Sequence, residues 1–274
     1  MYRKFDDKTL KKLHDTHLEL LDEFVKICDK HKFNYSLAYG TLLGAIRHKG
    51  FIPWDDDVDL FMPRSDYEEF LKIAQEELGE KYYLDHFGVN KDYYLQFAKL
   101  KKNGTLFDEE TTHNFNNHKG IFIDIFPVDN VSDNYKIAHT KAALIKIISN
   151  TISVKNKFCK VSETRYPFVV RILKIFSKKS LMKIQRKLSV NKNSNSKYIA
   201  CYYSVYPFKK EMFERSEFLP TTKAEFEGKN YQVVKNYDKF LTQLYGNYME
   251  LPPEEKRVNH MPLKIEFGDN KNEN

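Results

Sequence analysis

Cysteine is scarce in this chain of 274 residues, which has only Cys28, Cys159 and Cys201, all far apart. Their number is odd and their spacing fits neither a zinc site nor a redox pair, so we expect free thiols in a reducing compartment. Long apolar runs are also missing. No stretch approaches the roughly 18 uninterrupted apolar residues of a membrane-spanning helix, and the N-terminal residues lack the apolar centre of a secretory signal. These absences predict a cytoplasmic protein.

Acidic side chains are almost missing between residues 138 and 197, where Glu163 is the only one against fifteen Lys or Arg. This basic segment has a net charge of +14, so the remainder carries −7 of the overall +7. Its helical apolar residues, such as Phe168, Ile172 and Ile175, suit a surface that meets an anionic membrane. The alternative is a solvated helical face whose apolar side chains pack on the body of the protein. RNA-binding patterns are missing, so we expect no nucleic-acid partner.

Hydrophobic spacing predicts an α/β protein. Helical periodicity covers residues 7–32, and a capping box at Ser65–Glu68 predicts a helix over 66–78. Apolar and aromatic runs predict strands at 34–39, 57–62, 81–87, 93–100 and 120–129, the last ending at Pro127. A mostly helical stretch follows from about 135 to 190, and one more helix is expected at 231–244.

Negative charge gathers in "YGTLLGAIRHKGFIPWDDDVDLFMPR", where Asp55, Asp56, Asp57 and Asp59 lie within five positions. Side chains two apart on a strand share a face, so Asp57 and Asp59 should point the same way. Neighbouring carboxylates stabilise a fold poorly, but they suit Mg²⁺ or Mn²⁺. Asp124, an acid in an apolar strand, is the third ligand expected on an adjacent strand. The alternative for Asp124 is a salt bridge to a nearby Lys, and Asp55 and Asp56 could be ligands or hold the loop.

A phosphate cradle is expected upstream of these acids. Gly40 and Thr41 follow a strand and open a helical turn, where glycine lets a phosphate approach and the helix N-terminus attracts it. Arg47 and His48 should supply cationic contacts across the loop, and Lys99 should supply one from a neighbouring strand. The alternatives are an ordinary turn, and basic side chains that merely balance the acidic loop.

Three aromatic residues are expected to have ordinary roles. Trp54, the only tryptophan, could stack on a base or a choline-like cation, but packing is the preferred interpretation. His14 and His17 stand on an amphipathic helix and are expected at its surface.

The order of strand, Gly-Thr, Asp-apolar-Asp and a third acid resembles the nucleotidyltransferase superfamily, and the fuller text resembles the LicD family within it. "GIFIDIFPVD", "FEG" and "YGNYMELPPEEKR" match the same family. The resemblance implies a nucleotidyltransferase-type mixed sheet flanked by helices. We expect a catalytic core at 1–130, a basic helical insertion at 131–200, and a part at 201–274 that completes the catalytic domain.

LicD-type proteins are phosphocholine and related phosphopolyol transferases. The resemblance implies Mg²⁺-dependent transfer of phosphocholine from CDP-choline to a hydroxyl of a cell-surface glycan, such as teichoic acid or lipopolysaccharide, with release of CMP. Asp57, Asp59 and Asp124 would be the catalytic, metal-holding acids, and Asp124 could also take the proton of the hydroxyl. A lipid-linked acceptor at the inner face of the cytoplasmic membrane would fit the basic segment.

Three alternatives stay open. The donor could carry ribitol or glycerol instead of choline. The enzyme could be a true nucleotidyltransferase that moves a nucleotide and releases pyrophosphate. The protein could also be a non-catalytic binder of membrane or nucleic acid, against which the three acids argue.

Overall fold

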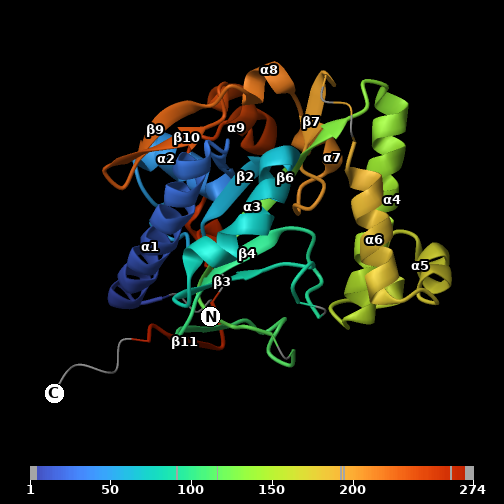
Figure 1. The fold of residues 1–274 in the computed structure, drawn as a ribbon, viewed down its shortest axis with the longest axis horizontal. Helices are drawn as coiled ribbons and strands as arrows, with labels where there is room; N and C mark the ends of the chain where they lie inside the picture. The colour runs from blue at the N-terminus through green and yellow to red at the C-terminus, as the bar shows by residue number, and fades with distance from the viewer. Residues whose placement is uncertain are drawn as a thin grey trace.

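The computed structural model describes residues 5–90, 92–115, 117–191, 193, 195–259 and 261–268. A mixed sheet forms the centre of a body covered by helices, and a further group of helices stands to one side (Figure 1). The predicted α/β fold class is confirmed. Lys192, which we counted in the basic segment, lies outside the described residues.

Strand β6 (Phe122–Val131) is the centre of the sheet. Strand β2 (Asp59–Pro63) runs parallel to it on one side, and β4 (Ala98–Lys102) runs antiparallel on the other. Strands β1 (Ser36–Leu37) and β3 (Tyr82–Asp85) extend the sheet to the order β1-β2-β6-β4-β3. The alternating and continuous apolar runs of the sequence thus become one buried layer.

Pro127 lies inside β6, so the prediction that the strand ends there is wrong. Strand β4 pairs with β6 only as far as Ile125, and β7 (Tyr198–Ala200) pairs with it from Asp129 onward. Pro127 falls between these two partners, where its missing N–H interrupts no ladder on that side. β6 therefore continues and carries β7, which pairs in turn with β8 (Met212–Glu214).

Helices α1 (Asp7–His31) and α3 (Arg64–Leu78) pack against each other and on the sheet. The first agrees with its predicted range. The predicted capping box of α3 is wrong, because the helix begins after Pro63 and has no side-chain cap. Glu68 accepts a hydrogen bond from Arg64 (3.1 Å) instead of closing back on the backbone.

Helix α9 (Tyr237–Tyr245) begins later than the predicted 231–244. Strand β10 (Lys229–Val233) takes the first part of that range and forms a hairpin with β9 (Thr222–Phe226). The apolar residues there fit both a strand and a helix over so short a run. The remaining elements are α2 (Tyr39–His48), β5 (Leu106–Asp108), β11 (Lys264–Glu266), α7 (Phe208–Glu211), α8 (Arg215–Phe218) and the 3-10 helices Val161–Glu163 and Glu254–Lys256.

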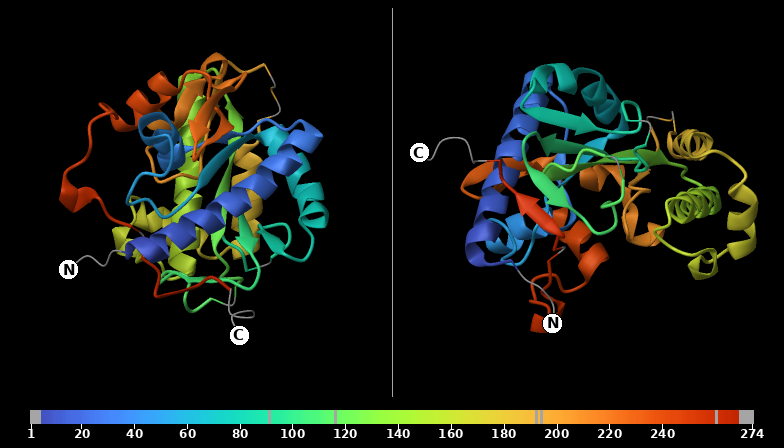
Figure 2. Two further views of the ribbon diagram at one scale, coloured as in Figure 1. Left: turned by 90° about the vertical axis from the view of Figure 1, so that its left-hand side faces the viewer. Right: turned by 90° about the horizontal axis from the view of Figure 1, so that it is seen from below.

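Helices α4 (Tyr135–Lys155), α5 (Pro167–Leu173) and α6 (Lys178–Ser189) form the helical group beside the body (Figures 1 and 2). The predicted helical stretch is therefore confirmed. Its small core is separate from that of the body and contains Ile148, Ile152, Leu181 and Met182. Within the described part of the chain, no helix is long and apolar enough to cross a bilayer.

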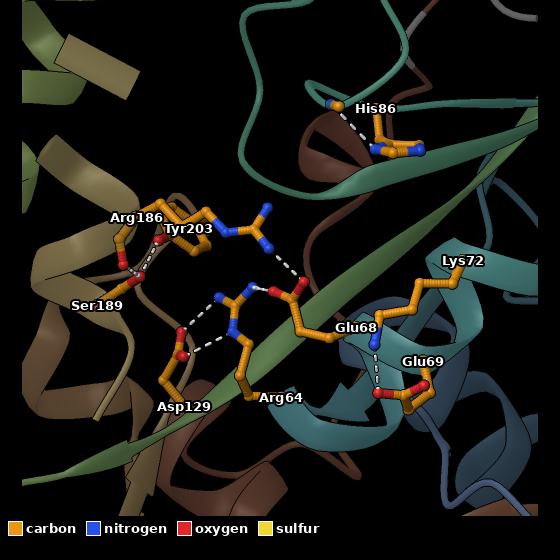
Figure 3. Close-up of polar contacts among 10 residues, drawn as sticks. Arg64, Glu68, Glu69, Lys72, His86, Asp129, Arg186, Ser189 and Tyr203 are labelled. Carbon is orange, nitrogen blue, oxygen red and sulfur yellow. Dashed lines mark hydrogen bonds and ion pairs between the residues drawn. The ribbon is translucent and has the colours of Figure 1, made fainter. Parts of the chain in front are cut away.

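A chain of ion pairs ties this helical group to the body (Figure 3). Arg64 donates two hydrogen bonds of 2.7 Å to the buried carboxylate of Asp129. Burial opposes the charge of Arg64, but Asp129 more than offsets that effect, so the pKa of the guanidinium is raised. Glu68 contacts both Arg64 and Arg186, which belongs to α6. The network therefore fixes α6 against α3 and β6.

Candidate active site

Three charged side chains lie in one row across the centre of the sheet. The strand register places Asp59 of β2 beside Asp124 of β6, and Asp124 beside Lys99 of β4. Asp124 therefore stands on the strand next to Asp59, where we expected it. Its role as a ligand stays a prediction.

Asp57 reaches this row from a loop. The prediction that Asp57 and Asp59 share the face of a strand is wrong in its local structure, because β2 begins at Asp59. The preceding run of acids follows a turn in which the amide of Asp55 donates to the carbonyl of Ile52 (2.8 Å). Adjacent carboxylates are poor strand formers, which favours the loop.

The three carboxylates influence one another. Burial raises the pKa of Asp59 well above its ordinary value, and repulsion from Asp57 and Asp124 adds to the shift. Burial also raises the pKa of Asp124, although Lys99 opposes this. The cluster therefore resists full ionisation, and a bound divalent cation would remove that resistance.

Lys99 supplies positive charge to the row. Its Nζ lies 2.9 Å and 3.2 Å from the two carboxylate oxygens of Asp124, and 3.3 Å from the ring centre of Phe122. This contact is the salt bridge that we gave as the alternative for Asp124. Among the residues that the structure describes, no three His, Cys, Asp or Glu side chains are arranged to hold a metal ion. The carboxylates suit such an ion chemically, but Asp124 would join them only after Lys99 releases it.

Gly40 and Thr41 position the acids. The hydroxyl of Thr41 is buried and accepts a hydrogen bond from the backbone N–H of Asp59 (2.9 Å), which fixes the start of β2. A Cβ added at Gly40 would lie 2.7 Å from Oδ2 of Asp55, so only glycine leaves room for that carboxylate. Both residues stand in the first turn of α2, and their contact with phosphate stays a prediction.

Arg47 and His48, at the end of α2, contact a distant loop. Arg47 donates to the carbonyl of Tyr248 (2.7 Å) and, through Nε, to Nε2 of His48 (2.9 Å). Burial and the neighbouring Arg257 lower the pKa of Arg47, and Asp55 partly opposes them. Two guanidinium groups thus lie close to each other and to the acidic loop. Their electrostatic repulsion would be relieved by a bound anion.

Two residues of the C-terminal part, Arg257 and Glu227, were missed by sequence reasoning. The guanidinium of Arg257 lies 5.1 Å from the ring centre of Trp54. The ring of Trp54 packs on the core, so the packing interpretation of the tryptophan is confirmed. Glu227 accepts a hydrogen bond from the amide of Phe51 (3.0 Å) and so holds the loop that leads to the acids. The signal for both lay in the family-like motifs "YGNYMELPPEEKR" and "FEG", which contain them.

The first helix also supports the acidic loop. A ring nitrogen of His14 lies 2.8 Å from the carbonyl oxygen of Asp55, and its ring stacks on Phe51 at 3.8 Å. His17 is only 2% exposed. The expectation that both histidines lie at the surface is therefore wrong, because the acidic loop covers this face of α1.

Glu211 is a buried acid that sequence reasoning also missed. Both of its carboxylate oxygens accept from the hydroxyl of Tyr39 (3.1 and 3.2 Å), and Ser204 donates to it as well. Burial raises its pKa to about 7. In the sequence it stands among charged neighbours, in "FKKEMFERSE", so nothing marks it as interior.

Comparisons with known proteins agree with this picture. Residues 32–165 match the LicD/FKTN/FKRP nucleotidyltransferase domain. The lipopolysaccharide cholinephosphotransferase LicD of Haemophilus influenzae is 35% identical over 264 residues, which cover 92% of this chain and 96% of that protein. An uncharacterised protein of Rickettsia typhi is 23% identical over 175 residues, covering 54% of this chain and 57% of its own length. One of Rickettsia prowazekii is 27% identical over 136 residues, covering 50% and 47%.

Proposed function

Because the chain belongs to the LicD family and is a LicD-type phosphotransferase, we propose that it transfers phosphocholine from CDP-choline to a hydroxyl of a cell-surface glycan. The name of the Haemophilus relative supports phosphocholine as the group and a lipopolysaccharide-type glycan as the acceptor. The observation that carries the proposal is the row of Asp59, Asp124 and Lys99 across three strands. Acids of this kind suit the transfer of a phosphoryl group between two oxygens.

In this reaction the acceptor oxygen attacks the phosphorus that carries choline. The bond from that phosphorus to the oxygen bridging the diphosphate breaks, and CMP leaves with the bridging oxygen. The proton of the hydroxyl must go to a base, and we propose Asp124. Its position in the row beside Asp59 supports this role, because a general base must lie within reach of the proton that it takes.

We propose that Asp57, Asp59 and Asp124 hold Mg²⁺ or Mn²⁺. Burial and the repulsion from neighbouring carboxylates raise the pKa of Asp59, and both effects support a cation there. When bound, such an ion would neutralise charge on the diphosphate and orient it. Lys99 provides positive charge at the same row, and we propose that it leaves Asp124 to contact a phosphate oxygen when the donor binds.

The donor diphosphate is proposed to lie beside the first turn of α2. Gly40 and Thr41 offer backbone N–H groups and the positive end of the helix dipole. Arg47 and Arg257 offer guanidinium groups near Asp55, where their repulsion supports an anion. His48 holds the orientation of Arg47 through its hydrogen bond.

The test is to incubate the purified protein with Mg²⁺, lipopolysaccharide as the acceptor and a panel of CDP-choline, CDP-ribitol, CDP-glycerol and CTP, following products by phosphorus NMR. We expect CMP from CDP-choline and no reaction after chelation of the metal. Preference for CDP-ribitol or CDP-glycerol would show that the enzyme transfers the phosphate ester of that alcohol and not phosphocholine. Pyrophosphate from CTP would instead show a true nucleotidyltransferase.

We further propose peripheral contact with an anionic membrane at the inner face of the cytoplasmic membrane, through α5 and the turn after it. The side chains of Phe168, Ile172 and Ile175 are 73%, 48% and 78% exposed. Packing on the body therefore does not account for these three. Arg171 and Lys174 are exposed among them, and each basic residue near an anionic surface contributes about 1 kcal/mol.

Co-sedimentation with vesicles of phosphatidylglycerol and phosphatidylcholine tests this surface. We expect binding at low salt that weakens at high salt and is lost in a Phe168→Ser/Ile175→Ser variant. Val89→Ser is the matched control, since Val89 is 55% exposed on the body. Protein that stays in the supernatant at low salt would contradict the membrane proposal.

A further inference from the structure

A cleft lies between α4 and the body. Its outer cavity, of about 420 Å³, is lined by α4 and by residues 201–209. Its inner cavity, of about 210 Å³, is lined by α4, by Gln185 of α6, and by residues 94–97 and 202–205. The two adjoin, because Lys146 and Tyr202 line both. We name them together the α4 cleft.

The α4 cleft leads to the carboxylate row at two points. Tyr206 lines the outer cavity, and the pKa of its hydroxyl is raised by burial first, with smaller contributions from the charges of Glu211, Asp59 and Asp57. Phe97, which lines the inner cavity, lies with its ring centre 5.8 Å from Nζ of Lys99. A molecule in the cleft would thus present a group directly to the reacting centre.

The α4 cleft is positively charged. Lys146, Arg165 and Lys209 line the outer cavity, and the described residues that line the two cavities include no Asp or Glu. His139 also lines it, and its Nε2 is buried without a hydrogen-bond partner in the described part of the chain. A buried polar atom without a partner costs free energy, so it marks a place where a ligand would be stabilised.

The α4 cleft and the proposed donor position at α2 lie on different sides of the central strands. Figure 1 shows α2 and α4 on opposite sides of β2 and β6. In an in-line transfer, the attacking and leaving oxygens lie on opposite sides of phosphorus. A donor held at α2 therefore receives the attacking hydroxyl from the side of α4.

We propose that the α4 cleft binds the acceptor, and that this acceptor is a saccharide bearing a phosphate or carboxylate contacted by Lys146, Arg165 and Lys209. The inference rests on the proposed function, since an acceptor exists only for a transferase. Tyr202 and Phe208, stacked with ring centres 5.3 Å apart, form an apolar wall for the sugar. Binding sites combine such walls with a few placed polar groups.

The experiment uses the full chain and three probes: glucose 6-phosphate, glucuronate and glucose. Binding is measured by calorimetry for the wild type and for a Lys146→Gln/Arg165→Gln variant. The matched control is Lys136→Gln/Lys183→Gln, which removes two exposed cations of α4 and α6 that do not line the cleft. CMP release from CDP-choline is measured in parallel, with lipopolysaccharide as the acceptor.

At least one charged sugar should bind about tenfold more tightly than glucose, and the cleft variant should lose about that factor, the equivalent of ~1.4 kcal/mol. The charged sugar that binds identifies the anion as phosphate or carboxylate. The control variant should bind and release CMP as the wild type does, whereas the cleft variant should release CMP more slowly. Equal binding of charged and neutral sugars, or undiminished binding by the cleft variant, would overturn the proposal. Wild-type protein that binds the charged sugar but releases no CMP from CDP-choline in the presence of lipopolysaccharide would instead overturn the proposed function and with it the acceptor assignment.

Discussion

The body and the helical group handle charge in opposite ways. In the body, cations lie in direct contact with acids, as the buried Lys101 does with Asp85 at 2.7 Å and the half-buried Lys99 with Asp124 at 2.9 Å. In the helical group, basic residues outnumber acids fifteen to one between 138 and 197. Cations of the body thus pair with acids of the body, and these pairs fix the positions of neighbouring side chains. In the helical group, Arg186 contacts Glu68 of the body, but cations such as Arg171, Lys174 and Lys183 are exposed and can act on a partner outside the fold.

Breaking the buried ion pair of the body from which the network reaches the helical group should have the largest effect. Arg64→Ala leaves the buried carboxylate of Asp129 without its cation, and loss of one partner of a buried pair typically costs about 3–5 kcal/mol. We expect the free energy of unfolding in urea to fall by that amount. Arg171→Ala, at an exposed position on α5, is the control and should change it by less than ~0.5 kcal/mol. Equal values for the two variants would show that the Arg64–Asp129 pair does not stabilise the fold.

Removing an acid from the row tests the body's role in the chemistry. Asp59→Ala, or Asp57→Ala, should lower turnover by at least about 1000-fold, or ~4 kcal/mol of barrier. The melting temperature should stay or rise, because repulsion among the carboxylates is relieved. Asp15→Ala, an exposed acid of α1, controls for loss of charge. Activity of the Asp59 variant within about tenfold of wild type would contradict the proposal that Asp59 holds the metal ion.

Glu211 is an exception to the matching of charge in the body, since its described partners are hydroxyls. Its pKa of about 7 in the folded protein lies above the ordinary value of 4.5. The folded state therefore keeps a proton that the unfolded state loses, and stability falls as pH rises from about 4.5 to 7, by about 3 kcal/mol in all. Glu211→Gln should abolish this loss, so the difference in unfolding free energy between variant and wild type should grow over that range. A difference that does not depend on pH would contradict the buried, protonated state.

Asp124→Asn distinguishes a reacting acid from a partner of Lys99. The amide keeps the shape but cannot take a proton or offer a full negative charge. We expect turnover at saturating Mg²⁺ to fall by about 100-fold, or ~2.7 kcal/mol. An unchanged rate, measured beside the conservative Asp124→Glu, would leave Asp124 as a structural salt-bridge partner.

The smallest effect is expected on the surface of the helical group. Lys183→Gln and Lys187→Gln remove exposed cations of α6 and should change the free energy of unfolding by less than ~0.5 kcal/mol. Thermal melts of the single and double variants check this. A fall in the free energy of unfolding above about 1 kcal/mol would show that these charges stabilise the fold and are not reserved for an outside partner.

The sequence predicted those parts of the molecule whose signals are local. An acid inside an apolar run has few stable environments, which is why Asp124 could be assigned to the strand beside Asp59. The contact of Lys99 with Asp124 depends on the antiparallel register of β4, which no local pattern encodes. The same holds for Arg64 with Asp129, which lie far apart in the chain. The start of α3 was misjudged because Glu68 had a stronger partner in Arg64 than the backbone.

The pairing of Val131 with Tyr198 has a consequence for the evolution and engineering of the chain. The polypeptide leaves the sheet at the end of β6 and re-enters it at the neighbouring position of β7. Residues 132–197 are therefore a long insertion between two neighbouring antiparallel strands. Such an insertion can be exchanged as a cassette, because its two ends already meet. A relative's cassette grafted at these two points would retain the strands that carry Asp59, Asp124 and Lys99 while replacing the wall that α4 contributes to the cleft.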